Sequence, residues 1–121
     1  SRRIIGEYRV STDDILSGAR FDDAVAYVTF GADLHTKSNK GQNCFQVKPY
    51  HLPMRALIPK GYKGIIVAGR CISGSREAMA SYRVTGNCAQ MGESAGYYVA
   101  EAIKKGVDIH DVKLNLHLAD E

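Results

Sequence analysis

The stretch RVTGNCAQMGESAGYYVAEAIKK, from Arg83 to Lys105, decides the fold because it predicts one long helix. From about Asn87 onward, apolar residues recur every four positions, which places them on one helix face. These residues are Met91, Ala95, Val99 and Ile103. Lys104 and Lys105 lie near the negative end of the helix dipole, and Gly106 is placed to act as the C-cap.

Glycines at the start of this helix and inside it need an explanation. Each interior glycine costs roughly 1 kcal/mol relative to alanine. Ala89, Gly92, Gly96 and Ala100 form a stripe of small residues, and Gly86 precedes it. Such a stripe lets another backbone or a flat ligand approach the helix axis. Two interpretations follow: tight packing of the helix across a sheet, or a helix whose N-terminus faces an anion or an electron-rich group.

Composition restricts the class of protein. The 121 residues suffice for one domain, and 45% hydrophobic with 24% charged residues is typical of a soluble globular chain. The net charge of +3 comes from Lys and Arg residues that are dispersed along the chain, which argues against nucleic acid as a partner. No apolar run approaches the roughly 20 residues that span a bilayer, so no membrane association is expected.

Three cysteines, Cys44, Cys71 and Cys88, form an odd set without a CxxC pair. This pattern favours neither a disulfide framework nor a metal site. We expect small buried side chains in a reducing compartment, with the cytoplasm favoured. The chain starts SRRIIG, without a methionine or a visible signal peptide, so a processed product or a part of a longer protein is expected.

The rest of the sequence predicts short strands and loops around this helix, and therefore an α+β fold with partly antiparallel strands. A strand is predicted over residues 3–11, and a short helix capped by Ser11 or Thr12 and closed by Gly18 follows it. A second strand is predicted over residues 24–30, which are β-branched and aromatic.

The middle and the end of the chain carry weaker signals. Residues 35–43 predict a polar loop, and residues 45–64 contain all three prolines and predict an interrupted extended segment. Residues 70–82 are rich in Gly and Ser and predict a connection with room for one helical turn. A short final helix is predicted from Asp111.

The run IIVAG, Ile65 to Gly69, predicts a buried parallel strand just before this connection. Gly69 and Arg70 then lie at the carboxyl end of a strand, where open α/β sheets place their ligand crevice. The residues that bring donors or positive charge to this neighbourhood are Arg70, Ser73, Arg76 and Arg83. A strand, a glycine, a polar loop and a helix with a small-residue face are together typical of a nucleotide or flavin site.

Several of these segments resemble a known family. VAGRCIS (67–73) and EAMASYRVTGNCAQMGESAG (77–96) resemble the C-terminal signature of a family of FAD-dependent oxidoreductases, in the glutathione-reductase-like group. SRRIIGEYRVSTDDILSGARFDDAVAY (1–27) resembles the segment just upstream, and HLPMRALIPKGYKGIIVAGR (51–70) resembles the approach to the last strand of the flavin domain. The resemblance covers nearly the whole chain.

The resemblance implies a division of the chain and a set of cofactor contacts. Residues 1–58 would come from the substrate side, and residues 59–121 from the returning part of the FAD-binding domain. Gly69 and Arg70 would lie near the ribityl and pyrophosphate portion of FAD, and the turn 85–88 would direct its amides at the pyrimidine edge of the isoalloxazine. The implied cofactor-binding residues are Gly69, Arg70, Ser73, Arg83, Thr85, Gly86, Asn87, Cys88 and Gly92. No catalytic residue and no metal ligand is assigned.

The sequence lacks the G-x-G-x-x-G fingerprint that binds the pyrophosphate after an N-terminal strand. The chain is therefore expected to be a C-terminal fragment of an FAD-dependent oxidoreductase that acts on an unknown small-molecule substrate. It would be inactive alone, would not retain FAD, and would need the N-terminal part of the same polypeptide, with a homo-oligomer as a further option. One alternative is a small non-catalytic protein-interaction domain whose glycine stripe packs against a partner. Another is a cysteine-based redox or metal protein that uses Cys71 and Cys88.

Overall fold

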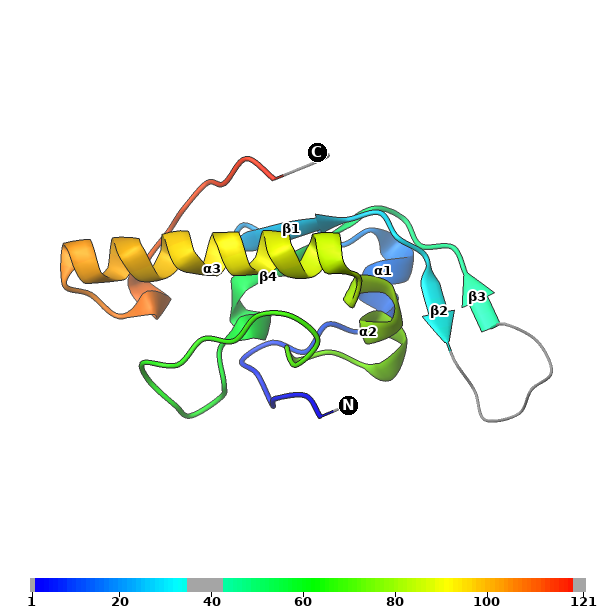
Figure 1. Ribbon diagram of the computed structural model, residues 1–121, viewed down its shortest axis with the longest axis horizontal. Coiled ribbons are helices and arrows are strands. Elements are labelled where there is room, and N and C mark those ends of the chain that lie inside the picture. The colour runs from blue at the N-terminus through cyan, green and yellow to red at the C-terminus, as the bar shows by residue number, and fades with distance from the viewer. Residues whose placement is uncertain (1, 35–42, 119–121) are drawn as a thin grey trace.

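Helix α3, Thr85–Lys105, runs along the long axis of the computed structural model (Figure 1). The structure describes residues 2–34 and 43–118. The elements are α1 (Thr12–Ser17), β1 (Ala24–Val28), β2 (Ala32–Leu34), β3 (Asn43–Phe45), β4 (Tyr50–Pro53), the 3-10 helix η1 (Met54–Leu57), α2 (Arg76–Tyr82), α3 and the 3-10 helix η2 (Ile109–Asp111).

The strands form two antiparallel pairs, β1 with β4 and β2 with β3. Helix α3 packs along β1, and α2 packs against β2. One continuous core joins both halves of the chain, from Val10 near the start to Val112 after η2. The predicted α+β class, with short antiparallel strands on one long helix, is confirmed.

Side chains of α3 bind the backbone of β1. The Ser94 hydroxyl donates a hydrogen bond to the Val25 carbonyl at 2.7 Å, and the Tyr27 amide donates to the Gln90 side-chain oxygen at 2.5 Å. Because β4 occupies the other edge of β1, these two contacts satisfy backbone groups that would otherwise lie unpaired beneath the helix. Ser94 and Gln90 therefore fix both the position and the rotation of α3.

The apolar face of α3 is rotated from the predicted one. The buried residues are Met91, Ser94, Ala95, Tyr98 and Ala102. Met91 and Ala95 confirm the start of the predicted stripe, but Val99 is only half-buried and Ile103 is 76% exposed. A four-residue spacing advances about 40° past a full turn at each step, so the later members of the stripe leave the core. The predicted helix and its C-cap Gly106, at φ 64°, are confirmed.

The short helices follow their capping residues. In α1 the Ser11 hydroxyl accepts from the Asp14 amide, while the Asp14 carboxylate accepts from the Ser11 amide, and Gly18 ends the helix at φ 73°. This helix and the strand β1 were both predicted from the sequence. Helix α2 is longer than the single predicted turn because Ser75 caps it, accepting from the Ala78 amide.

Three predicted elements are wrong. Residues 3–11 form only isolated bridges, at Gly6 and Val10, and the chain bends at Glu7 and Tyr8. Residues 65–69 are not a buried parallel strand: Ile65 is 47% exposed, and both described sheets are antiparallel pairs that exclude this segment. Instead of a helix from Asp111, η2 ends at Asp111, and residues 112–118 form neither helix nor strand. The predicted loop 35–43 lies outside the described residues except for Asn43, which starts β3.

Gly74 is required where the chain passes the buried Tyr82. A Cβ atom at Gly74 would lie 2.5 Å from the Tyr82 hydroxyl oxygen, and that hydroxyl is directed at the Ile72 carbonyl. We predict that Gly74→Ala lowers the free energy of unfolding by about 1–3 kcal/mol, because the fully buried ring has no room to move. Urea unfolding of the purified chain measures this change.

Gly96→Ala is the matched control for this substitution. A Cβ at Gly96 meets nothing within 4 Å, so alanine should raise the free energy of unfolding by up to about 1 kcal/mol through helix propensity. Equal effects of the two substitutions would contradict the packing described for Gly74.

Candidate functional site

The N-terminus of α3 lacks a side-chain cap. The N-cap residue is Val84, which has no side chain able to accept a hydrogen bond, and the first turn contains no acidic residue. Thr85 and Gly86 are exposed, and a Cβ at Gly86 would meet nothing within 4 Å. The first amides of a 21-residue helix therefore present their positive partial charge at an open surface.

Asn87, in the same turn, carries an unpaired polar atom. Its side-chain nitrogen Nδ2 is buried and has no hydrogen-bond partner in the described structure. Leaving a buried donor unpaired costs about 1–3 kcal/mol. The first turn thus combines free amides with a side-chain donor that requires an acceptor.

The turn at residues 68–71 lies beside this helix end. A Cβ at Gly69, which has φ 100°, would lie 4.0 Å from the Cys88 Sγ, and the Cys71 thiol donates to the Ala68 carbonyl at 3.6 Å. Burial raises the pKa of the Cys88 thiol, although the neighbouring charge of Arg70 opposes that shift. The structure therefore brings Gly69, Arg70 and Cys88 together at the start of α3.

The raised pKa of the Cys88 thiol argues against the cysteine-based redox or metal protein. A thiol that stays protonated is a poor nucleophile and a poor metal ligand. All three cysteines are free, and Cys44 is exposed while Cys71 and Cys88 are partly buried. The expectation that the cysteines are buried is thus wrong for Cys44, whose thiol donates to the Asp33 carboxylate at 3.3 Å.

Arg83 and Ser73 make their contacts away from the first turn of α3. The Arg83 guanidinium pairs with the Asp33 carboxylate at 3.6 Å and donates to the Asp33 carbonyl at 3.4 Å, which ties the α2–α3 junction to β2. Ser73 is 2% exposed, and its backbone amide donates to the Ala56 carbonyl while its carbonyl accepts from the Val10 amide. Ser73 is therefore buried, and the Arg83 side chain, although 32% exposed, is engaged with Asp33.

Gly92 and Gly96 lie on the open side of α3. Both are exposed, and a Cβ at either would meet nothing within 4 Å. Within residues 2–34 and 43–118, nothing packs against this part of the small-residue stripe. Tight packing on a sheet of the same described chain therefore does not explain these two glycines.

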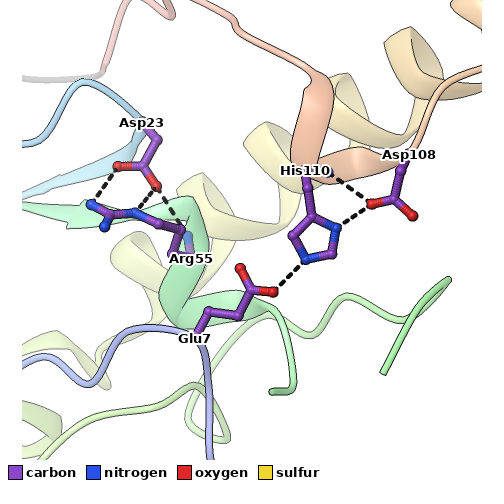
Figure 2. Close-up of polar contacts among 5 residues, drawn as sticks. All are labelled: Glu7, Asp23, Arg55, Asp108 and His110. Atoms are coloured by element: carbon purple, nitrogen blue, oxygen red, sulfur yellow. Dashed lines mark hydrogen bonds and ion pairs between the residues drawn. The ribbon is translucent and has the colours of Figure 1, made fainter. Parts of the chain in front are cut away.

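A second polar cluster, at the other end of α3, was not predicted. Figure 2 shows Arg55 against Asp23, and His110 between Glu7 and Asp108. Arg55 binds both carboxylate oxygens of Asp23, at 3.0 and 3.3 Å. These residues other than Asp108 line a cavity of about 760 Å³. No sequence signal links Glu7 to His110, because 103 positions separate them.

Comparison with known proteins supplies the family. None of the described helices is long and apolar enough to cross a membrane, and no three His, Cys, Asp or Glu residues among the described positions are placed to hold a metal ion. No curated protein and no solved structure matches the sequence. The family described as FAD dependent oxidoreductase matches residues 1–119, almost the entire chain. The chain therefore belongs to the FAD-dependent oxidoreductase family.

Proposed function

We propose that this chain supplies the flavin-facing C-terminal part of an FAD-dependent oxidoreductase of the glutathione-reductase-like group. The complete protein would transfer a hydride or electrons between a small-molecule substrate and FAD. FAD supplies that redox chemistry when bound, and the protein orients it and tunes its electrostatics. The observation that carries the proposal is the uncapped start of α3, together with the buried Nδ2 of the Asn87 side chain, which has no hydrogen-bond partner among the described residues.

The donors at this site fit a flavin. The pyrimidine edge of the isoalloxazine presents hydrogen-bond acceptors and gains negative charge on reduction. The groups that the site offers are the amides of Thr85 and Gly86 and the Nδ2 of Asn87, all of them donors. A helix N-terminus stabilises a neighbouring negative charge by roughly 0.3–1 kcal/mol, and by more when the pair is partly buried.

The surrounding residues provide access and support. Gly69, at φ 100°, has no side chain at the edge of the site, and Gly86 and Gly92 leave the helix surface open for a flat ring. The exposed Arg70 offers a positive charge for a phosphate beside the same helix end. Arg83 acts as a positioning residue, since its contacts with Asp33 hold the first turn of α3 in place.

Under this proposal, the 121 residues supply only half of the FAD site. The 121 residues contain no G-x-G-x-x-G fingerprint, so another part of the same polypeptide must bind the adenosine half of FAD. The apolar segment 65–69, partly exposed and outside both described sheets, would pair with strands of that part. In the proposed division, residues 1–58 lie on the substrate side and residues 59–121 complete the FAD-binding domain.

A small protein-interaction domain remains the second candidate. The open face at Gly92 and Gly96 is the observation that favours it, because a partner helix could approach there as closely as a flavin. A protein partner would not, however, need the free donors at the start of α3. The two candidates therefore differ in whether FAD is bound once the fingerprint is supplied.

We predict that the purified 121-residue chain does not bind FAD at micromolar concentration, because it has no pyrophosphate site. Titration with FAD, followed by flavin fluorescence, measures this. The protein that also carries the fingerprint-bearing part should quench the fluorescence stoichiometrically. Micromolar binding by the chain alone contradicts the half-site proposal, and absence of binding by the longer protein favours the interaction domain.

We predict that Asn87→Asp weakens FAD binding by about two- to five-fold in the longer protein and lowers the flavin reduction potential. The new carboxylate replaces a donor and opposes negative charge on the reduced ring, by an amount comparable to the helix-dipole term. The stability of the fold should not fall, since an acidic residue in the first turn suits the helix dipole. Fluorescence titration and spectroelectrochemistry measure the two changes.

Asn115→Asp is the matched control, since it makes the same chemical change elsewhere. Asn115 lies after η2 and lines one cavity with Tyr98 and another with Gln90 and Tyr97 of α3, and neither cavity is lined by Asn87. Asn115→Asp should leave both the affinity for FAD and the flavin reduction potential unchanged. If Asn87→Asp behaves like this control, the start of α3 does not face the flavin.

A further inference from the structure

His110, in η2 directly after α3, is held between two carboxylates. Its Nδ1 contacts the Asp108 carboxylate and its Nε2 contacts the Glu7 carboxylate (Figure 2). A carboxylate only accepts hydrogen bonds, and a neutral imidazole has a single N–H donor. Both contacts can therefore form only when the ring carries two protons and a positive charge.

These contacts join segments that are distant in the sequence. Glu7 lies in the N-terminal segment before α1, and its amide donates to the Ile58 carbonyl at 3.0 Å. Asp108 caps η2 because its carboxylate accepts from the His110 amide at 3.0 Å. The imidazolium thus connects the turn after α3 to the N-terminal segment, and through it to the end of η1. The three side chains are 30–34% exposed, so protons can reach the ring from solvent.

The surrounding charges favour the protonated ring. The hydrogen bond to Asp108 raises the pKa of His110 most, partial burial opposes the shift, and Glu7 raises the pKa further. Lys63 is the cation near Asp108. Arg55 is the cation near Glu7, and it is already paired with Asp23 at 3.0 Å.

The cluster also forms part of the wall of the 760 Å³ cavity. Glu7 and His110 line it from opposite segments, together with Tyr98 of α3 and Val112 of the tail. The remaining charged residues around this cavity are Arg20, Asp22, Asp23, Arg55 and Lys113. A change in the Glu7–His110 contact would therefore change one wall of the cavity.

We propose that Glu7, His110 and Asp108 form a proton-operated latch between the N-terminal segment and the turn after α3. The protonated ring closes the latch. After the ring loses one proton, the remaining proton stays on Nδ1, which keeps its hydrogen bond to Asp108. This bond is the more local one, because Asp108 is two residues away and its carboxylate also accepts from the His110 amide. The Nε2 lone pair then faces the Glu7 carboxylate, and two acceptors cannot form a hydrogen bond. The contact between His110 and Glu7 is therefore lost, and these two residues of the cavity wall move apart.

The direction of the pH dependence follows from the raised pKa. A group whose pKa is higher in the folded state stabilises the fold fully below its unfolded pKa. For this histidine that unfolded value is close to the ordinary 6.5. The stabilisation then decreases as pH rises through the folded pKa, so the latch opens on the alkaline side.

The first test follows the His110 ring by NMR during a pH titration of the intact protein. The titration midpoint of the wild type should lie above 6.5, and both Glu7→Gln and Asp108→Asn should move it down. Asn at position 108 retains the helix-capping ability, so the turn is preserved in that variant. The control is His117→Gln, which removes a tail histidine for which the described residues provide no carboxylate contact, and it should not move the midpoint. A wild-type midpoint at or below 6.5, or one that neither variant moves, overturns the latch.

The second test separates a latch from simple packing. The difference in unfolding midpoint between the wild type and Glu7→Gln should be largest below pH 6.5 and should disappear as pH rises through the measured midpoint of His110. Over the same range, hydrogen-exchange protection of the Glu7 amide should fall in the wild type and stay constant in the variant. A stability difference that does not change with pH would show a merely structural contact and would refute the proposal.

Discussion

The attachment of α3 to β1 sets the geometry of the whole chain. Ser94 and Gln90 bind the backbone of Val25 and Tyr27, while Met91 and Ala95, on the same helix, lie on its buried face. Hydrogen bonds to an edge strand are directional, so they specify the rotation of the helix more sharply than apolar contacts alone. Once this rotation is fixed, it determines which residues of α3 are buried and which are exposed.

That rotation explains the position of the candidate flavin site. With Ser94 against the strand, Gly92 and Gly96 must face away from it, and the first turn of α3 meets the 68–71 loop. The first backbone amides of α3 and the Asn87 Nδ2, which has no partner among the described residues, then lie in the same turn. The same rigid helix carries the His110 cluster just beyond its other end, so the two polar regions are held apart by its length.

From the sequence, residues were named for the candidate site, and the structure shows which of them lie together. Residues at the start of α3 were assigned to a cofactor site from the stripe of small residues and from the resemblance to the family, and this assignment stays a prediction. The observed contacts of Ser73 and Arg83 were not predicted, because the position of Ser73 beneath Gly6 and the ion pair of Arg83 with Asp33 depend on segments far along the chain. The Glu7–His110 contact had no sequence signal for the same reason.

Local chemistry in the sequence determined the short helix that ends at Gly18, the C-cap of α3 at Gly106 and a strand predicted over residues 24–30, of which 24–28 form β1. These features depend on neighbours within a few residues, where spacing and capping preferences act directly. Tertiary structure decided which face of α3 is buried and left Ile103 exposed despite its spacing. It also kept residues 65–69 out of any described sheet, because a strand requires partner strands and an apolar run cannot supply them by itself.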